Sequence, residues 1–272
     1  MLSTLKPTRR PGEYGEGDTF IGVRIPKIRQ IVKDHRGTDV DTAVLLVRGE
    51  VHEERTLGLL LLVDLFERSV KRDKETALSV FNAYMAHTQH INNWDLVDTT
   101  APKIVGRWLL EGGGVGVREW IDSQGPQVKT EVKVEVKTEP GRRRPKRSRA
   151  VSLEIEDAGT PGDADYIETF MVILARSPDL WERRIAMVCN LHLIRQRVFS
   201  YTLTIARMLL TDGHDLIHKA VGWMLREVGN RDLETEEEFL REHYRTMPRT
   251  MLRYAIEKFE EGKRQDYLKG RI

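Results

Sequence analysis

The sequence predicts an all-α protein: a solenoid of antiparallel helix pairs, interrupted by one charged insertion. Three observations favour this class. Most hydrophobic segments have helical spacing and run for about 12 to 18 residues. Short turns join them, as in stacked helical repeats. Charged residues make up 32% of the chain, which suits helices with solvated outer faces.

The N-terminal half contains four expected helices. Pro26 falls early in the first, where a missing N–H costs nothing. The second is apolar on most faces and should be central. Pro102 should end or kink the fourth just after Thr100, and the glycine-rich run 112–116 breaks the helical stretch. The four segments are residues 24–35, 52–69, 74–89 and 93–111.

The C-terminal half contains six further expected helices: residues 165–177, 178–196, 200–210, 215–229, 233–246 and 248–259. No strong sequence period accompanies them, so the repeat is structural. We therefore expect one helical-repeat domain in two parts, 18–121 and 165–272. An atypical, truncated segment, 1–17, precedes the first part.

Residues 122–164 differ in composition from the rest of the chain. Large apolar residues other than valine are almost absent, and alternating lysine and glutamate lead into a basic block. Such a segment cannot bury a core, so we expect a disordered insertion. The alternating run VKVEVK could form a strand, but nothing beside it offers a partner.

Two patterns in the insertion suggest partners. The repeats VKTE, VKVE and VKTE resemble the acceptor pattern for SUMO conjugation, with Lys129, Lys133 and Lys137 as acceptors. The run 142–149 resembles a nuclear import signal read by an import receptor, and it could also bind DNA phosphates. Its basic residues are Arg142, Arg143, Arg144, Lys146, Arg147 and Arg149. A solvated charge run is the alternative. In a eukaryote the protein would be nuclear, and otherwise cytoplasmic.

Composition limits the other classes. The net charge is only +2, so a nucleic-acid partner requires a local basic surface. Cys189 is the single cysteine, which excludes an intrachain disulfide, and its apolar surroundings predict a buried core thiol. No stretch approaches the ~18 apolar residues of a membrane span. The first residues lack the apolar region of a secretion signal.

Three predicted helices each pair a tryptophan with an ionisable residue on one face. An indole can pack on sugar or base while a cation meets phosphate. Each pair alone could be a core-edge tryptophan beside a solvated charge, but three together favour a shared groove for nucleic acid. The pairs are Trp94 with Asp98, Trp181 with Arg184, and Trp223 with Lys219.

Several segments in the same order resemble the DNA alkylation repair glycosylases of the AlkD family. They are PGEYGEGDTFIGVRIPKIR (11–29), NNWDLVDTTAPKIVG (92–106), LWERRIAMV (180–188), DLIHKAVGWMLREVGNRD (215–232) and MPRTMLRYAIEKF (247–259). The resemblance covers about 20–120 and 165–262. It implies a HEAT-like solenoid with a basic DNA-binding face. It also implies hydrolysis of the N-glycosidic bond of cationic N3- or N7-alkylated purines. We expect a monomer that acts on double-stranded DNA.

The resemblance also implies roles for individual residues. Asp98, the last residue of WDLVD, would be the catalytic carboxylate, and Trp94 would line the lesion site. Arg184 would contact DNA near the lesion, and Trp223 would form a second aromatic wall. We add Lys219 and Arg24 to the DNA-binding residues. The family has one or two more helices before PGEYGEGD, so that end of the solenoid is expected to be short.

The chemistry needs one carboxylate and no cofactor. Alkylation makes the purine cationic, so it leaves without protonation, and an anion near C1′ stabilises the developing charge. Asp95 is the nearest rival of Asp98, but it follows Trp94 directly and points to another face. No lysine is marked as a Schiff-base nucleophile, which favours a monofunctional enzyme. The alternative is a non-catalytic helical-repeat module that binds nucleic acid or a protein.

A metal site is not expected. His214 and His218 are one turn apart, but no third ligand follows at a recognisable spacing, so a capping or groove-edge role is preferred. HEER (52–55) lacks the second histidine of a zinc protease motif.

Overall fold

The computed structural model describes residues 17–125 and 163–272, and it is all-α, as the sequence predicts. An isolated parallel β-bridge joins Thr19 to Val51. None of the helices described is long and apolar enough to cross a membrane.

The first range contains seven α-helices, one 3-10 turn and one π-helical turn. They are α1 (Ile25–Asp34), α2 (Val40–Val47), α3 (His52–Ser69), α4 (Lys74–Ala86), the 3-10 turn η1 (Thr88–His90), α5 (Trp94–Thr100), the π-helical turn η2 (Pro102–Gly106), α6 (Arg107–Glu111) and α7 (Val117–Ser123). The sequence did not predict α2 or α7, because helices of eight and seven residues are too short to show a clear period.

The second range continues the helical pattern. Its elements are α9 (Asp163–Ala175), α10 (Leu180–Val188), α11 (Asn190–Arg195), α12 (Ser200–Met208), η3 (Leu209–Thr211), α13 (Asp215–Gly229), α14 (Leu233–His243), α15 (Arg249–Ala255), η4 (Ile256–Lys258) and α16 (Glu261–Lys269). The expected helix 178–196 is two helices that meet at Cys189. The mostly polar α16 was not predicted.

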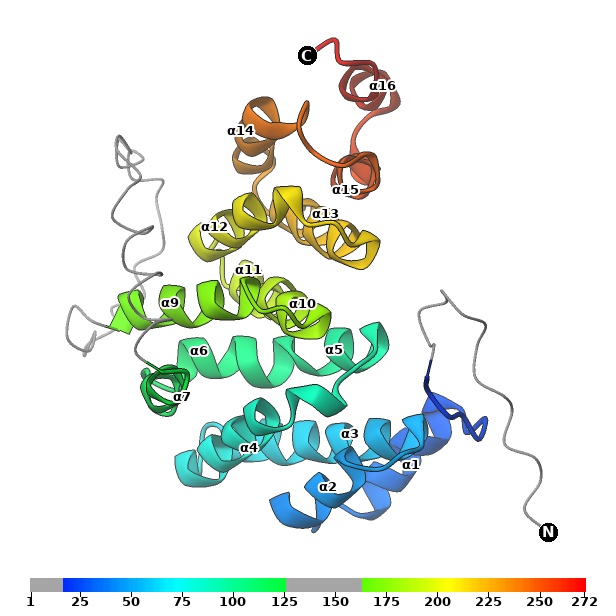
Figure 1. The fold of residues 1–272 in the computed structure, drawn as a ribbon, viewed down its shortest axis with the longest axis vertical. Coiled ribbons are helices and arrows are strands. Elements are labelled where there is room, and N and C mark those ends of the chain that lie inside the picture. Colours follow the sequence, from blue (N-terminus) through cyan, green and yellow to red (C-terminus); the bar gives the residue numbers. More distant parts are fainter. Residues whose placement is uncertain (1–16, 126–162) are drawn as a thin grey trace.

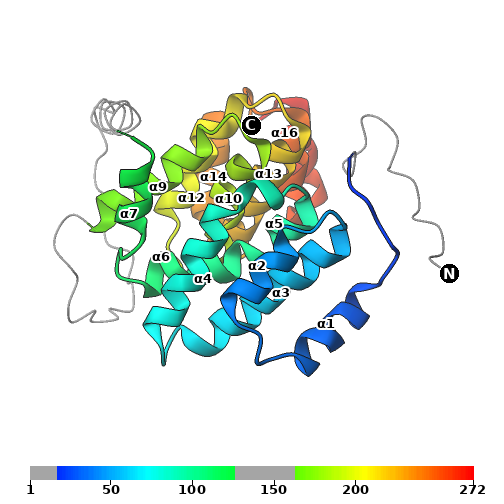
Figure 2. The same cartoon turned by 60° about the horizontal axis from the view of Figure 1, so that its bottom comes forward.

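The helices stack in chain order from one end of the molecule to the other (Figure 1). Five of them, α3, α5, α10, α13 and α15, form a continuous series in which each packs against the next. We call this series the main row. Figure 2 shows the same succession after rotation. All three expected tryptophan pairs lie on the main row, so segments far apart in sequence occupy successive layers.

One hydrophobic core runs through both parts of the chain. The expected central helix, α3, is buried on most faces, and Leu59, Leu62 and Phe66 are almost completely inaccessible. Cys189 is fully buried in the same core, as predicted, and burial raises the pKa of its thiol. The packing of α3 against α5 supports the helix that carries Trp94 and Asp98.

Pro102 does not lead the chain out of the helix. The α-helix α5 ends at Thr100, as predicted, but the chain continues through η2 into α6, because the wider π turn accommodates a residue without an N–H. In this turn the Gly106 N–H donates to the Ala101 carbonyl at 2.9 Å. A Cβ on Gly106 would lie 2.0 Å from the Cys189 carbonyl oxygen, so the close crossing with α11 requires glycine.

The limits predicted for the insertion are too wide by two residues at each end. Helix α7 extends to Ser123, and α9 begins at Asp163. The two helices pack together, with the Trp120 and Phe170 rings 4.8 Å apart. The proposed SUMO and import residues lie outside the described residues.

Candidate active site

An ion pair between Asp98 and Arg184 joins two neighbouring helices of the main row. Asp98 lies one turn after Trp94 on α5, and Arg184 lies on α10. The Arg184 Nε donates to Asp98 Oδ1 at 2.8 Å, and Nη2 donates to Oδ2 at 2.7 Å. This two-bond geometry is the strong form of an arginine–carboxylate contact. The fold therefore brings together two residues that are 86 positions apart in the sequence.

Arg184 also reaches the next helix of the row. Its Nη1 donates to the Leu216 carbonyl at the start of α13, and the residue is only 4% exposed. This differs from the expected contact with DNA phosphate, which needs an accessible guanidinium. The reason is the layer order: α10 lies between α5 and α13, so its side chain is enclosed by both. In this structure Arg184 acts on Asp98.

The Asp98 carboxyl is shielded, with its side chain 17% exposed. Burial raises the pKa of Asp98, and the nearby charge of Asp95 raises it further. The hydrogen bonds and charge of Arg184 act in the opposite direction and lower this pKa, but the net shift is upward. Arg184 is thus the group that favours the ionised form of a largely buried carboxylate.

The three tryptophans differ in exposure. Trp94 is 43% exposed at the start of α5, whereas Trp181 and Trp223 are partly buried and pack against the core. Trp94 is therefore the indole with the most surface for a ligand among the three.

The two remaining expected binding residues are also placed. Lys219 on α13 forms an ion pair with Asp215 at 2.7 Å, one turn earlier. Arg24 is exposed and immediately precedes α1, which packs against α3.

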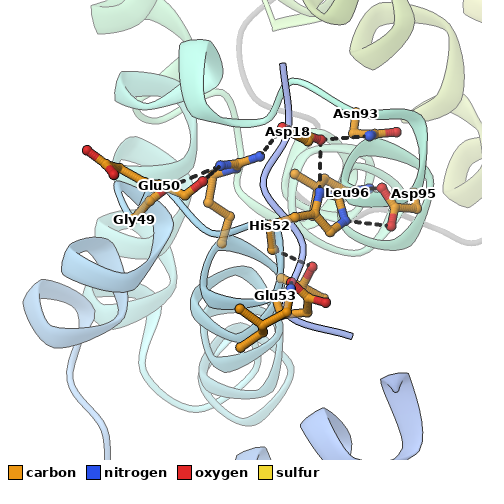
Figure 3. A network of polar contacts seen from close by, with 11 residues as sticks. Asp18, Gly49, Glu50, His52, Glu53, Asn93, Asp95 and Leu96 are labelled. Carbon is orange, nitrogen blue, oxygen red and sulfur yellow. Dashed lines mark hydrogen bonds and ion pairs between the residues drawn. The ribbon is translucent and has the colours of Figure 1, made fainter. Parts of the chain in front are cut away.

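A buried polar network lies beside the start of α5, and sequence reasoning missed it (Figure 3). The His52 Nδ1 lies 3.1 Å from Asp18 Oδ2, and Nε2 lies 2.9 Å from Asp95 Oδ2. Both partners are carboxylates, so the ring donates from both nitrogens as an imidazolium. Burial lowers the pKa of His52, but the hydrogen bonds and charges of Asp18 and Asp95 prevail and raise it to about 9.

Asp18 is the other centre of this network. Its carboxylate accepts from Asn93 Nδ2 at 2.8 Å and pairs with Arg55. Burial would raise the pKa of Asp18, but hydrogen bonds from His52 and Asn93 and the charge of Arg55 hold it below its usual value. The only sequence signals were an aspartate within the segment 11–29 and the HEER run, and neither indicates a contact with Asp95.

His214 and His218 have the local role that was preferred for them. The His214 Nδ1 accepts from the Leu216 N–H at 3.1 Å and caps α13, and His218 Nε2 contacts the Asp212 carbonyl. No cluster of three or more histidine, cysteine, aspartate or glutamate side chains suited to a metal occurs within 17–125 and 163–272.

The fold and this site define a helical-repeat protein with a carboxylate–arginine pair on its main row of helices. A family model described as DNA alkylation repair enzyme matches residues 3–126 and 162–259, on both sides of the insertion. The chain therefore belongs to the DNA alkylation repair enzyme family, which confirms the predicted resemblance and a role in alkylation repair.

Solved structures share this fold, among them the following protein. It is described as a predicted DNA alkylation repair enzyme from Enterococcus faecalis, is 16% identical and covers 90% of each chain, with a TM-score of 0.55. At this identity the likeness concerns the fold alone. No curated protein sequence matches the chain.

Proposed function

We propose that this protein is a monofunctional DNA glycosylase that hydrolyses the N-glycosidic bond of cationic N3- or N7-alkylated purines in double-stranded DNA. The observation that carries the proposal is the Asp98 carboxylate, held by two hydrogen bonds from Arg184 and one turn from the exposed indole of Trp94.

The arrangement supports chemistry that needs a single anion. The alkylated base leaves as a neutral group, so the reaction has to stabilise positive charge developing at C1′. Asp98 supplies a negative charge and can orient a water. Asp95 contacts the His52 ring and accepts from the Leu96 N–H, and the proposal assigns it no catalytic role.

The aromatic surface supports a DNA partner. The exposed indole of Trp94 can stack on a base or sugar, a contact that tolerates any sequence. Trp223 and Lys219 lie on α13, two layers further along the main row, and would extend this surface. No cofactor is part of the proposal.

The deciding experiment is base release from methylated duplex DNA, with N3-methyladenine and N7-methylguanine resolved. We expect free methylated base from the wild-type protein, and strand breaks only after alkaline treatment. DNA binding without base release would favour the alternative, a non-catalytic helical-repeat module. Strand breaks without alkali would contradict the monofunctional assignment.

Replacing residues 126–162 with a short glycine–serine linker should leave folding and base release unchanged. Helices α7 and α9 pack directly, through Trp120 and Phe170 among others, so the linker spans neighbouring elements at little entropic cost. Thermal unfolding and initial rates check this. An insertion of scrambled sequence and the same length is the control. A folded but inactive linker variant would show that the segment belongs to the DNA-binding surface.

We also propose that the basic run directs nuclear import and that the lysine repeats accept SUMO in a eukaryotic cell. Both patterns lie in the insertion, so these roles are separable from base release. Glutamine at the six basic positions of 142–149 would reduce nuclear accumulation, and arginine at Lys129, Lys133 and Lys137 would remove conjugation. Unchanged localisation would leave DNA tethering as the function of the run.

A further inference from the structure

We infer that His52 is a positioning residue of this active site: its ring joins Asp18 to Asp95, holds the start of α5 and offsets the negative charge of Asp95 near Asp98. The inference rests on the proposed function for its relevance to catalysis. Its geometry is independent of that function, because both ring contacts are within hydrogen-bond distance, at 3.1 and 2.9 Å.

The start of α5 is held from outside the helix. Asn93 occupies the position before the first helical residue, but its side chain makes no capping bond. Its Nδ2 donates instead to Asp18 at 2.8 Å, while Asp95 contacts His52. Trp94 therefore lies between two residues that are both anchored to the same network. The network fixes the first turn, and thus the direction of the exposed indole.

Figure 3 shows the His52 ring between Asp18 and Asp95. Its backbone N–H donates to the Thr19 carbonyl at 2.8 Å, its ring centroid lies 4.6 Å from that of Phe20, and it is 4% exposed. The next residue, Glu53, accepts from the N–H groups of Ile21 and Gly22 at 3.1 and 2.7 Å. Residues 18–22 are therefore held by hydrogen bonds against the first turn of α3.

The charge of His52 has a second consequence. Asp95 and Asp98 are three residues apart on α5, and the charge of Asp95 raises the pKa of Asp98. A cation on Asp95 opposes this effect. The pKa of His52, raised to about 9, keeps the ring charged through neutral pH. The compensation is therefore constant over the range in which Asp98 has to be ionised.

Several described ionisable groups face Asp98 and His52 from neighbouring elements. Arg184 faces Asp98 from α10. From α4, the Tyr84 hydroxyl lies 3.0 Å from the Thr100 hydroxyl, and Thr100 is on α5 like Asp98. On the side of His52, the facing charges are Asp18 and Asp95, and Asp18 is paired with Arg55. Removing the charge of His52 thus leaves Asp95 without a cation among these contacts.

The first test is His52→Gln, which retains a hydrogen-bond donor and removes the charge. Two readouts are compared: titration of the Asp98 carboxyl by 13C NMR, assigned by its loss in Asp98→Asn, and the pH profile of single-turnover base release. We expect both the titration and the acid limb of the profile to move to higher pH, because the charge of Asp95 is then no longer offset. His243→Gln, at another partly buried histidine on α14, is the matched control and should move neither.

A second substitution tests the charge mechanism. Adding Asp95→Asn to His52→Gln removes the negative charge that His52 offsets, so the Asp98 titration should return towards that of the wild type. A purely structural role predicts no such return. If His52→Gln does not fold, Asp95→Asn alone keeps the inference testable, because it should move the Asp98 titration to lower pH.

The outcomes separate the two proposals. A wild-type protein that releases no base contradicts the proposed glycosylase, while the NMR titration still tests His52. An active wild type whose Asp98 titration is unchanged by His52→Gln or by Asp95→Asn overturns the inference about His52.

Discussion

Asp98→Asn should remove nearly all base excision while the fold persists. A carboxylate about 4 Å from a developing cation contributes roughly 4 kcal/mol at an effective dielectric near 20. That corresponds to about three decades in rate, as an upper value. The asparagine oxygen can still accept one of the two bonds from Arg184, and Arg184 keeps its bond to Leu216. Single-turnover base release and duplex binding measure the effect.

A second aspartate–arginine pair provides a matched control, because Arg183 is the neighbour of Arg184 on α10. Arg183 Nε donates to Asp212 Oδ2 at 2.7 Å, in another shielded aspartate–arginine pair. Asp212→Asn therefore weakens a similar ion pair without changing Asp98, and it should retain base release. An Asp98→Asn protein within threefold of the wild-type rate would contradict the catalytic assignment. Equal losses in both variants would indicate a stability effect.

Arg184→Ala should destabilise the protein by about 3 kcal/mol and also abolish most activity. The substitution leaves a largely buried carboxylate without its cation, and breaking a buried pair on one side costs about 3 to 5 kcal/mol. The lower value is appropriate because the Asp98 side chain retains 17% exposure. The Leu216 carbonyl loses its donor as well. Urea unfolding gives the stability difference, with Arg183→Ala as the matched control.

The pH dependence of this destabilisation has a definite sign. Arg184 lowers the pKa of Asp98 against the effect of burial, so its removal raises that pKa further. A carboxyl whose folded-state pKa lies above the unfolded value destabilises the fold at high pH, and protonation relieves the cost as pH falls. The stability difference from wild type should therefore shrink between neutral and acidic pH. A difference that is constant with pH would mean that Arg184 acts through packing.

Two further measurements on Arg184 distinguish its possible roles. Arg184→Lys keeps the charge but loses the planar two-bond geometry, so its activity should fall between those of wild type and Arg184→Ala. The salt dependence of DNA binding should be unchanged in Arg184→Ala, because the guanidinium is buried. If the slope of log K against log salt concentration fell in magnitude by about one, Arg184 would contact a DNA phosphate, as the sequence suggested.

Local sequence was enough to determine much of the helical framework. It predicted α13 from the helical spacing of its apolar residues and α3 from a long run that is apolar on most faces, both with their observed ends. It also marked Trp94 and Asp98 as neighbours on one face, because that relation depends only on helix geometry. The order of the motifs pointed to the alkylation repair family.

The tertiary structure alone decided which side chains meet. Arg184 reaches Asp98 because α10 packs between α5 and α13, and His52 reaches Asp18 and Asp95 across 34 and 43 positions. Such contacts depend on the stacking order of helices, which no local spacing encodes. The stacking also enclosed Arg184, which the sequence suggested was open to DNA. It also brought Gly106, at the end of the wider turn that begins with Pro102, so close to the Cys189 carbonyl that a Cβ would not fit.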